Sequence, residues 1–308
     1  MTNHQSKQSV FTSALSAAVS GEGDAVWSEA PAQVLRVRDG FVLADVDSSA
    51  TPGLENNKQG GQRAGEALFE NGRVEANDLQ ERLWAESRFG ATRCVLVVLQ
   101  GMDTAGKGGI VKHVFGGIDP QGVTVVGFTK PTPEELSHDF LWRVRSHLPT
   151  SGMLGVFDRS HYEDVLIGRV HNLATPAEID ERYGRINEFE QKIIENGTTI
   201  LKVMLHISAD EQKSRLADRL NRPEKHWKYA PSDLDERALW PQYQNAYQRV
   251  FERTSTSDAP WFVVPADHKW YARLAVQQLL VEALRGLCLT WPAAHFDLAA
   301  ERARLGQS

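Results

Sequence analysis

The sequence predicts an α/β fold in which five parallel strands form one sheet covered by helices on both faces. Short, continuous apolar stretches recur along the chain, and helical patterns lie between them. A glycine-rich turn follows the first of these stretches directly. Continuous apolar strands that alternate with helices are typical of a parallel sheet buried on both sides.

The first strand is the clearest, because residues 94–100 are an unbroken apolar and β-branched stretch ending in Gln100. Two helices begin with the order threonine, proline, any residue and glutamate, which combines a capping residue with a proline in the first turn. They start after Thr132 and Thr175. The other predicted strands are 123–128, 152–157, 199–206 and 261–264, and the predicted helices are 78–87, 133–148, 176–196, 209–220, 233–254, which Pro241 could kink, and 269–287.

Four segments follow from this order. Residues 1–30 are expected to be a mobile tail, and 31–90 an arm and a helix that pack on the core. Residues 91–290 would form the main domain, with a basic lid at 213–230. Residues 291–308 would be a C-terminal tail.

Composition narrows the possible partners. The net charge of −6 argues against broad nucleic-acid binding, although local basic clusters can still hold a polyanion. No stretch is apolar enough to span a membrane, and the N-terminal residues lack the apolar core of a signal peptide. The two cysteines, Cys94 and Cys288, form no metal or disulfide pattern. A cytoplasmic protein is expected.

The strongest local pattern is the phosphate loop, residues 101–108, which reads Gly-Met-Asp-Thr-Ala-Gly-Lys-Gly. Its glycines let the backbone approach an anion, its N–H groups and the following helix start face phosphate oxygens, and Lys107 adds a full charge. An ordinary glycine-rich turn is the alternative. Position 108 is glycine, where this loop usually carries the hydroxyl that holds magnesium. Asp103 could supply that ligand instead, or merely stabilise the turn.

A second acidic position closes the third strand. Asp158 follows residues 152–157, and the carboxyl ends of parallel strands form the ligand-binding edge of such a sheet. Asp158 could hold a metal ion or position the attacking oxygen, and Arg159 could grip a phosphate, unless the two simply pair. His161 could act as a base, but a local hydrogen bond is the stronger expectation. Glu163, Asp164 and Arg169 could assist with metal, nucleotide or phosphate.

Basic side chains gather between residues 213 and 228, around Pro223. Arg215, Arg219 and Arg222 recur at helical spacing and are expected to share one face. A solvated helix face is the ordinary explanation. A lid that excludes water and neutralises phosphate charge is the functional one. Lys112, His113 and Lys130 could extend the positive groove.

Several of these motifs together resemble the polyphosphate kinase 2 family. They are Gly-Met-Asp-Thr-Ala-Gly-Lys-Gly-Gly at 101–109, Phe-Asp-Arg-Ser-His-Tyr-Glu-Asp-Val-Leu at 157–166 and the arginine-rich lid, with shorter matches at 43–53, 228–234 and 265–270. The likeness covers roughly residues 34–290. It implies a P-loop kinase fold of the thymidylate-kinase type, and magnesium, with manganese as a substitute.

The resemblance implies transfer of a terminal phosphate between polyphosphate and a nucleotide. The family's two motif aspartates match Asp103 and Asp158, and its loop lysine matches Lys107. His-Tyr-Glu-Asp at 161–164 looks like the branch that accepts both nucleoside mono- and diphosphates. The expected substrates are AMP or ADP, with GMP and GDP open, and the family often forms dimers or tetramers.

The expected site therefore has three parts. The catalytic residues are Asp103, Lys107, Asp158 and Arg159, and the two aspartates would also hold the metal. The phosphate contacts would be Gly101, Ala105, Gly106, Gly108, Gly109, Lys112, Arg215, Arg219, Arg222 and Lys225, and the nucleotide contacts Lys130, Arg159, His161, Glu163 and Arg169. An ATP-dependent nucleotide or metabolite kinase and a non-catalytic nucleotide-binding module are the alternatives.

Overall fold

The computed structural model describes residues 27–54 and 61–308, and a five-stranded parallel sheet forms its centre. The strand order is β2-β3-β1-β4-β5, and the five-stranded sheet was predicted from the sequence without this order. All four strand pairs are parallel. The strands are β1 (Cys94–Gly101), β2 (Val123–Gly127), β3 (Leu154–Asp158), β4 (Thr198–His206) and β5 (Trp261–Pro265).

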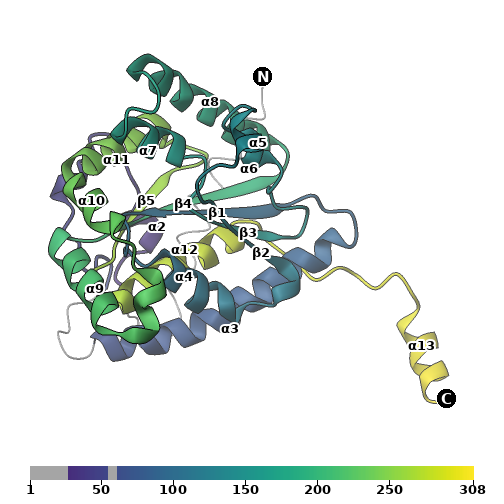
Figure 1. Ribbon diagram of the computed structural model, residues 1–308. Helices are drawn as coiled ribbons and strands as arrows, with labels where there is room; N and C mark the ends of the chain where they lie inside the picture. The colour runs from purple at the N-terminus through teal and green to yellow at the C-terminus, as the bar shows by residue number, and fades with distance from the viewer. Residues whose placement is uncertain (1–26, 55–60) are drawn as a thin grey trace.

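Helices cover both faces of the sheet, so the chain forms three layers (Figure 1). Residues of β1 alternate between two apolar clusters, because neighbouring side chains in a strand point to opposite faces. One layer contains α3 (Gly61–Ser87), α4 (Lys107–His113) and α12 (Lys269–Arg285). The other contains α7 (Glu163–Val170), α8 (Pro176–Glu195) and α11 (Trp240–Thr254).

The helix that begins at Pro176 confirms its predicted start. The hydroxyl of Thr175 accepts from the N–H of Glu178, and the Glu178 carboxylate accepts from the N–H of Thr175. The apolar side chains that recur at helical spacing are buried against the sheet. They are Ile179, Tyr183, Ile186, Phe189 and Ile193.

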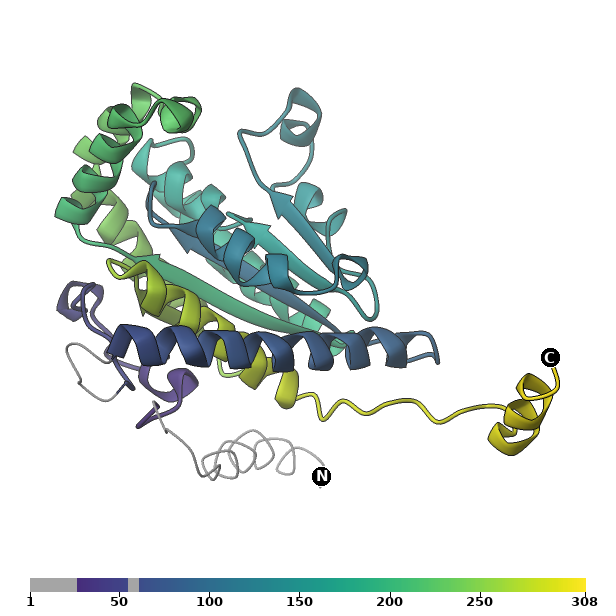
Figure 2. The same cartoon turned by 90° about the horizontal axis from the view of Figure 1, so that it is seen from below.

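The helix predicted at 78–87 is much longer, because α3 begins at Gly61. Glycine usually weakens a helix, and the two glycines at 65 and 72 obscured the pattern. Here they permit close packing on α12. A Cβ atom at Gly65 would lie 2.7 Å from the Trp270 ring, and one at Gly72 would lie 2.5 Å from the Gln277 side chain. Figure 2 shows α3 running beside α12.

Two predicted long helices are each divided. The segment 133–148 contains only α5 (Pro133–Leu136) and α6 (Trp142–Arg145), because Ser137 and Asp139 bond to nearby backbone groups between them. The segment 233–254 contains α10 (Ser232–Ala238) and α11. Proline has no N–H for a helix interior, and Pro241 therefore lies in the first turn of the second helix.

The N-terminal arm is more ordered than expected. It contains α2 (Pro31–Val34) and a 3-10 helix (Leu43–Asp45). Trp27, predicted to belong to the tail, forms an antiparallel bridge with Leu54. Between the two helices, Arg36 forms a bridge with Phe262, so the arm covers the outer edge of β5. The rest of the expected tail, residues 1–26, lies outside the described residues.

The lid segment and the C-terminal segment also contain helices. The lid segment spans part of α9 (Ala209–Asn221) and the 3-10 helix Pro223–Lys228. Two other short 3-10 helices, Phe115–Gly117 and Pro120–Gly122, lie between α4 and β2. The predicted C-terminal tail carries α13 (Leu298–Leu305), which stands away from the body (Figures 1 and 2). Within the described ranges, no helix has the length and apolarity needed to cross a bilayer.

Candidate active site

The phosphate loop connects β1 to α4 at the carboxyl edge of the sheet, as predicted. Gly101 and Gly106 adopt positive φ values of 151° and 114°, which side chains disfavour. A Cβ atom at Gly101 would also lie 2.8 Å from the carbonyl oxygen of Leu205 on β4. The loop therefore requires glycine at its first position for both conformation and space.

Lys107 folds back into this loop. Its Nζ donates to the carbonyl oxygens of Gly101 at 2.8 Å and Met102 at 3.4 Å, and the residue is only 8% exposed. The pKa of Lys107 is lowered, first by burial and then by the nearby Arg159. The carboxylates of Asp103, Asp158 and Glu163 act in the opposite direction and offset only part of this shift. These three carboxylates are thus close enough to Lys107 to influence its charge.

The turn after β3 brings Arg159 onto the phosphate loop. Asp158 is in register with Leu99 of β1, two residues before Gly101. Arg159 adopts a left-handed φ of 66°, and its N–H donates to the Leu99 carbonyl. Its guanidinium donates to Asp103 Oδ1 at 2.8 Å and lies 3.7 Å from Glu163 Oε2. The alternative in which Arg159 simply pairs with Asp158 is therefore not what the structure contains.

Strain and charge coincide in this turn. A left-handed conformation is costly for a residue with a side chain and persists where the surroundings impose it, often at functional sites. Burial alone would lower the pKa of Arg159, but Glu163 and Asp103 outweigh it and raise the pKa. Burial raises the pKa of Glu163, which Arg159 and Lys107 partly counteract. The site is a compact group of alternating charges.

Two carboxylates at this edge suit a magnesium ion. Asp103 and Asp158 are both partly exposed, and only one oxygen of Asp103 is used by Arg159. Magnesium in such enzymes is often held by one or two carboxylates, with substrate phosphates and water completing its shell. The residues present fit that requirement. Among the described residues, no group of three or more histidine, cysteine, aspartate or glutamate side chains could hold a metal without substrate.

Arg215 has a different position from the one its spacing suggested. We expected it to share an open face with Arg219 and Arg222, but it is 7% exposed. Its guanidinium donates to the carbonyl oxygens of Thr104 and Ala105 in the phosphate loop, and of Ala266 and Asp267 after β5. Arg215 therefore supports the loop from behind, and we remove it from the expected phosphate contacts.

Neighbouring side chains complete that support. Gln212 of α9 donates to the carbonyl oxygen of Asp103, and the Tyr247 hydroxyl of α11 accepts from the N–H of Gly101. Neither residue was predicted. Both lie far from the loop in sequence, and a polar residue on an amphipathic helix gives no sign of its distant partner.

The remaining basic lid residues bond within the lid segment or to α10, which follows it. Arg219 donates to the Lys228 carbonyl and the Asp233 carboxylate. Arg222 pairs with Glu224, and Lys225 pairs with Asp218. Trp227 is 78% exposed, with the Lys228 ammonium over its ring.

The expected nucleotide contacts divide into exposed and buried residues. Lys130 lies exposed beyond β2, and Arg169 lies exposed in the last turn of α7. Lys112, expected to contact phosphate, is exposed on α4, and Gly108 and Gly109 lie in the first turn of that helix. His161 is 1% exposed and faces away from solvent, so we remove it from the expected nucleotide contacts.

His161 belongs instead to a buried network that the sequence did not reveal. Its Nε2 lies 3.3 Å from Glu190 Oε1, which also accepts from the Tyr162 hydroxyl at 2.7 Å. Lys202 of β4 donates to Glu190 Oε2 at 2.6 Å and to the Thr254 carbonyl. A lysine inside an apolar strand was the available sign of a buried partner. The hydrogen bond of His161 is therefore not the local one expected, because Glu190 lies on α8, 29 residues further along the chain.

This fold and this site define a phosphotransferase of the P-loop kinase class. A sequence model described as Polyphosphate kinase 2 matches residues 63–287. The chain belongs to the polyphosphate kinase 2 family. The AMP/ADP-polyphosphate phosphotransferase of Meiothermus ruber is 47% identical over 252 residues, which cover 82% of this chain and 91% of that protein.

Two further relatives agree. The ADP-polyphosphate phosphotransferase of Rhodopseudomonas palustris is 43% identical over 228 residues, covering 70% of this chain and 78% of that protein. The crystal structure of polyphosphate kinase 2 from Arthrobacter aurescens is 56% identical, with a TM-score of 0.89. It covers 92% of this chain and 98% of the solved chain, so the likeness extends well beyond the phosphate loop.

Proposed function

We propose that this enzyme transfers the terminal phosphate of inorganic polyphosphate to AMP or ADP. The observation that supports the proposal is the convergence of Lys107, Asp103, Asp158 and Arg159 at one edge of the sheet. The enzymes of Meiothermus ruber and Rhodopseudomonas palustris are named for polyphosphate as a substrate and for AMP or ADP as the nucleotide.

In the proposed reaction, a terminal phosphate oxygen of the nucleotide attacks the last phosphorus atom of polyphosphate. A new P–O bond forms, the bridging P–O bond breaks, and the shortened chain leaves with the electron pair. No oxidant or reductant is needed, and the reverse reaction is chemically equivalent. Such transfers depend mainly on positioning and on charge stabilisation.

The residues of the site supply both positioning and charge stabilisation. The phosphate loop would hold the chain end, with Lys107 turning from its carbonyl partners toward the phosphate. Arg159 would stabilise charge on the transferred group, as arginine does well with phosphate. A magnesium ion held by Asp103 and Asp158 would neutralise phosphate charge, and manganese could replace it.

Lid and nucleotide contacts follow from exposure. We assign polyphosphate contacts to Arg219, Arg222 and Lys225, which would exchange their carboxylate partners for phosphate. Nucleotide contacts are assigned to Lys130, Glu163 and Arg169.

Self-association into a dimer or tetramer is also proposed, because the C-terminal segment exposes Trp291, Phe296 and Leu305. Light scattering on the purified chain measures the assembly directly.

A donor assay tests the function. The purified chain is incubated with polyphosphate and magnesium, separately with AMP, ADP, GMP and GDP, and without ATP. Formation of the next higher nucleotide is expected with AMP or ADP. The proposal is wrong if these mixtures stay inert while ATP phosphorylates a monophosphate, because that result identifies an ATP-dependent kinase.

A further inference from the structure

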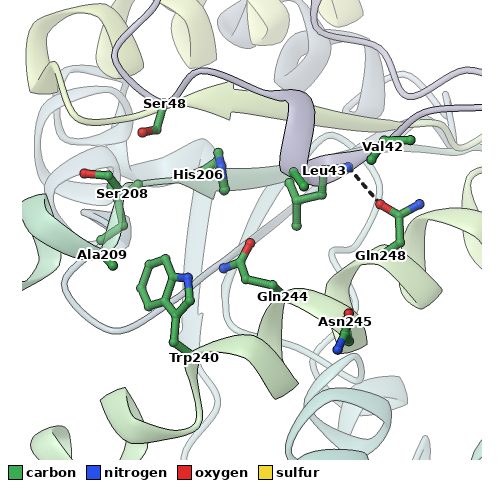
Figure 3. Close-up of a pocket in the computed structure, with 12 residues that line it drawn as sticks. Val42, Leu43, Ser48, His206, Ser208, Ala209, Trp240, Gln244, Asn245 and Gln248 are labelled. Carbon is green, nitrogen blue, oxygen red and sulfur yellow. Dashed lines mark hydrogen bonds between the residues drawn. The ribbon is translucent and has the colours of Figure 1, made fainter.

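A cavity of about 460 Å³ lies beside the phosphate site, between the N-terminal arm, the end of β4 and α11 (Figure 3). None of the catalytic residues named above lines it. Helix α11 borders both regions: Tyr247 reaches the phosphate loop at Gly101, and Gln244 and Gln248 line the cavity. The cavity therefore has a lining of its own, although it lies at the same carboxyl edge of the sheet as the catalytic residues.

The cavity wall is uncharged. It offers apolar side chains, hydroxyls, amides, one imidazole and one indole, and no lysine, arginine, aspartate or glutamate. A polyanion such as polyphosphate would find no counter-charge there. A volume of this size is ordinary for a small-molecule site, and a cavity of mainly apolar walls with a few polar groups is the usual form of one.

Two buried polar atoms in the wall lack partners among residues 27–54 and 61–308. His206 is 8% exposed, and its Nδ1 has no hydrogen-bond partner within these ranges. Burial lowers the pKa of His206 and favours the neutral ring, although Asp267 and a backbone hydrogen bond with Val46 oppose this shift. In a neutral ring one nitrogen donates and the other accepts, so Nδ1 can pair with a ligand in either role, according to the tautomer. The Gln244 Nε2 group is a donor that is also buried and unpaired.

Unpaired buried polar groups are uncommon and call for a partner. Some other polar side chains of the wall do have partners: Gln248 bonds to the backbone of Phe41 and Leu43, and Ser48 bonds to Asp267. The buried unpaired groups are thus one imidazole nitrogen and one amide donor, in a wall that also contains the aromatic ring of Trp240. A nucleobase edge presents the complementary donor and acceptor on a flat, uncharged ring.

We propose that this cavity binds a neutral, planar heteroaromatic group of nucleobase or nucleoside size. His206 pairs with the ligand through Nδ1, Gln244 donates to it, and Trp240 covers one of its sides. The proposal does not depend on the phosphate donor or on the reaction assigned above. The group could belong to a nucleotide or to a free nucleoside, and the experiment separates these sources.

The location connects the cavity to the phosphate loop. Ser208 and Ala209, at the start of α9, and Trp240, at the start of α11, all line it. These are the two ends of the chain segment that contains the lid. Ser48 and Ser208 also bond to the Asp267 carboxylate, and Arg215 joins the Asp267 carbonyl to the phosphate loop.

Calorimetric titration of the full chain with adenosine and guanosine, up to about 5 mM, tests the proposal. Two variants alter the wall: Gln244→Leu removes the donor, and Ala44→Trp fills the space from the exposed arm. Each is expected to weaken nucleoside binding at least about tenfold, as for one lost hydrogen bond. Gln242→Ala, on the exposed side of the same helix and outside the wall, is the matched control and should bind normally.

Lys107→Met separates the cavity from the catalytic site and should leave nucleoside binding unchanged. Thermal melting of each variant verifies folding, and Ala44→Trp keeps the test valid if Gln244→Leu is unstable. Competition by AMP assigns the ligand to a nucleotide, and absence of competition assigns it to a free nucleoside. The proposal is overturned if neither nucleoside binds, if both wall variants bind normally, or if Lys107→Met abolishes binding.

Discussion

Arg159 donates to Asp103 at 2.8 Å and thereby connects the turn after β3 to the phosphate loop after β1. The pair places a positive group beside a carboxylate assigned to magnesium. A bound metal ion would compete with Arg159 for Asp103, and a bound phosphate would compete with Asp103 for Arg159. Both side chains are therefore already positioned where charged substrates would bind.

Arg159→Ala removes the positive group that would face the transferred phosphate. We expect kcat to fall by roughly 10²–10³, as for loss of a charge-stabilising donor, with a smaller change in KM. Steady-state kinetics with polyphosphate and ADP give both values. Arg169→Ala, on the exposed last turn of α7, should have an effect mainly on KM for the nucleotide. Equal kcat losses in both variants would contradict the distinction.

Asp158→Asn keeps the shape of the side chain but removes a metal-binding charge. Transfer should become undetectable or fall by at least about 10², while the melting temperature stays within a few degrees. Single-turnover assays and thermal melting measure the two properties. Normal turnover in this variant would eliminate the role assigned to Asp158.

Metal removal should stop the reaction. Chelation with EDTA is expected to abolish transfer, and added magnesium or manganese to restore it, because Asp103 and Asp158 are oxygen ligands suited to such ions. Asp103→Asn should raise the magnesium concentration needed for half-maximal rate. Activity that persists in EDTA after exhaustive dialysis would rule out the metal requirement.

Arg215 and Arg219 should behave differently despite their helical spacing. Arg215→Met leaves four backbone carbonyls of two loops without their buried donor. We expect a loss of about 3 kcal/mol or more in the free energy of unfolding. Arg219→Met should change it by less than about 1 kcal/mol and instead raise KM for polyphosphate. Urea denaturation and kinetics on both variants provide the comparison.

Asp164 gives the stability a pH dependence. Burial raises its pKa to about 6, against the attraction of Arg182 and Arg143. The folded state therefore binds this proton more tightly than the unfolded state, and stability falls as pH rises from about 4 to about 6. Asp164→Asn lacks this loss. Between pH 4.5 and pH 7.5, the free energy of unfolding of the variant should rise by roughly 1–3 kcal/mol relative to that of the wild type. Urea denaturation measures both values, and a difference between the two proteins that does not change with pH would refute the assignment.

The sequence predicted the parts of the fold that local patterns specify. The strand 94–100, the phosphate loop and the capping box at Thr175 each depend on neighbouring residues, and each is present. Asp103, Lys107, Asp158 and Arg159 were brought together by one rule, that parallel strands share a carboxyl edge. The full length of α3 was missed because its glycines serve a distant helix.

Burial was the main limit for the site. Arg215 looked like its exposed neighbours, since helical spacing does not indicate which basic residue faces a loop some 110 residues earlier in the chain. His161, in the turn after β3, and Lys202, in β4, share the partner Glu190, which lies on α8. Such pairs depend on tertiary packing, and propensity and periodicity carry no information about them.

The bridge between Arg36 and Phe262 has a practical consequence for anyone who shortens this protein. Residues 35–37 occupy hydrogen-bonding groups of β5 that would otherwise be open to other chains. A truncated version that begins after residue 38 would therefore tend to aggregate through the exposed edge of β5, even with its catalytic residues intact. Expression trials should keep the first strand-like residues of the arm.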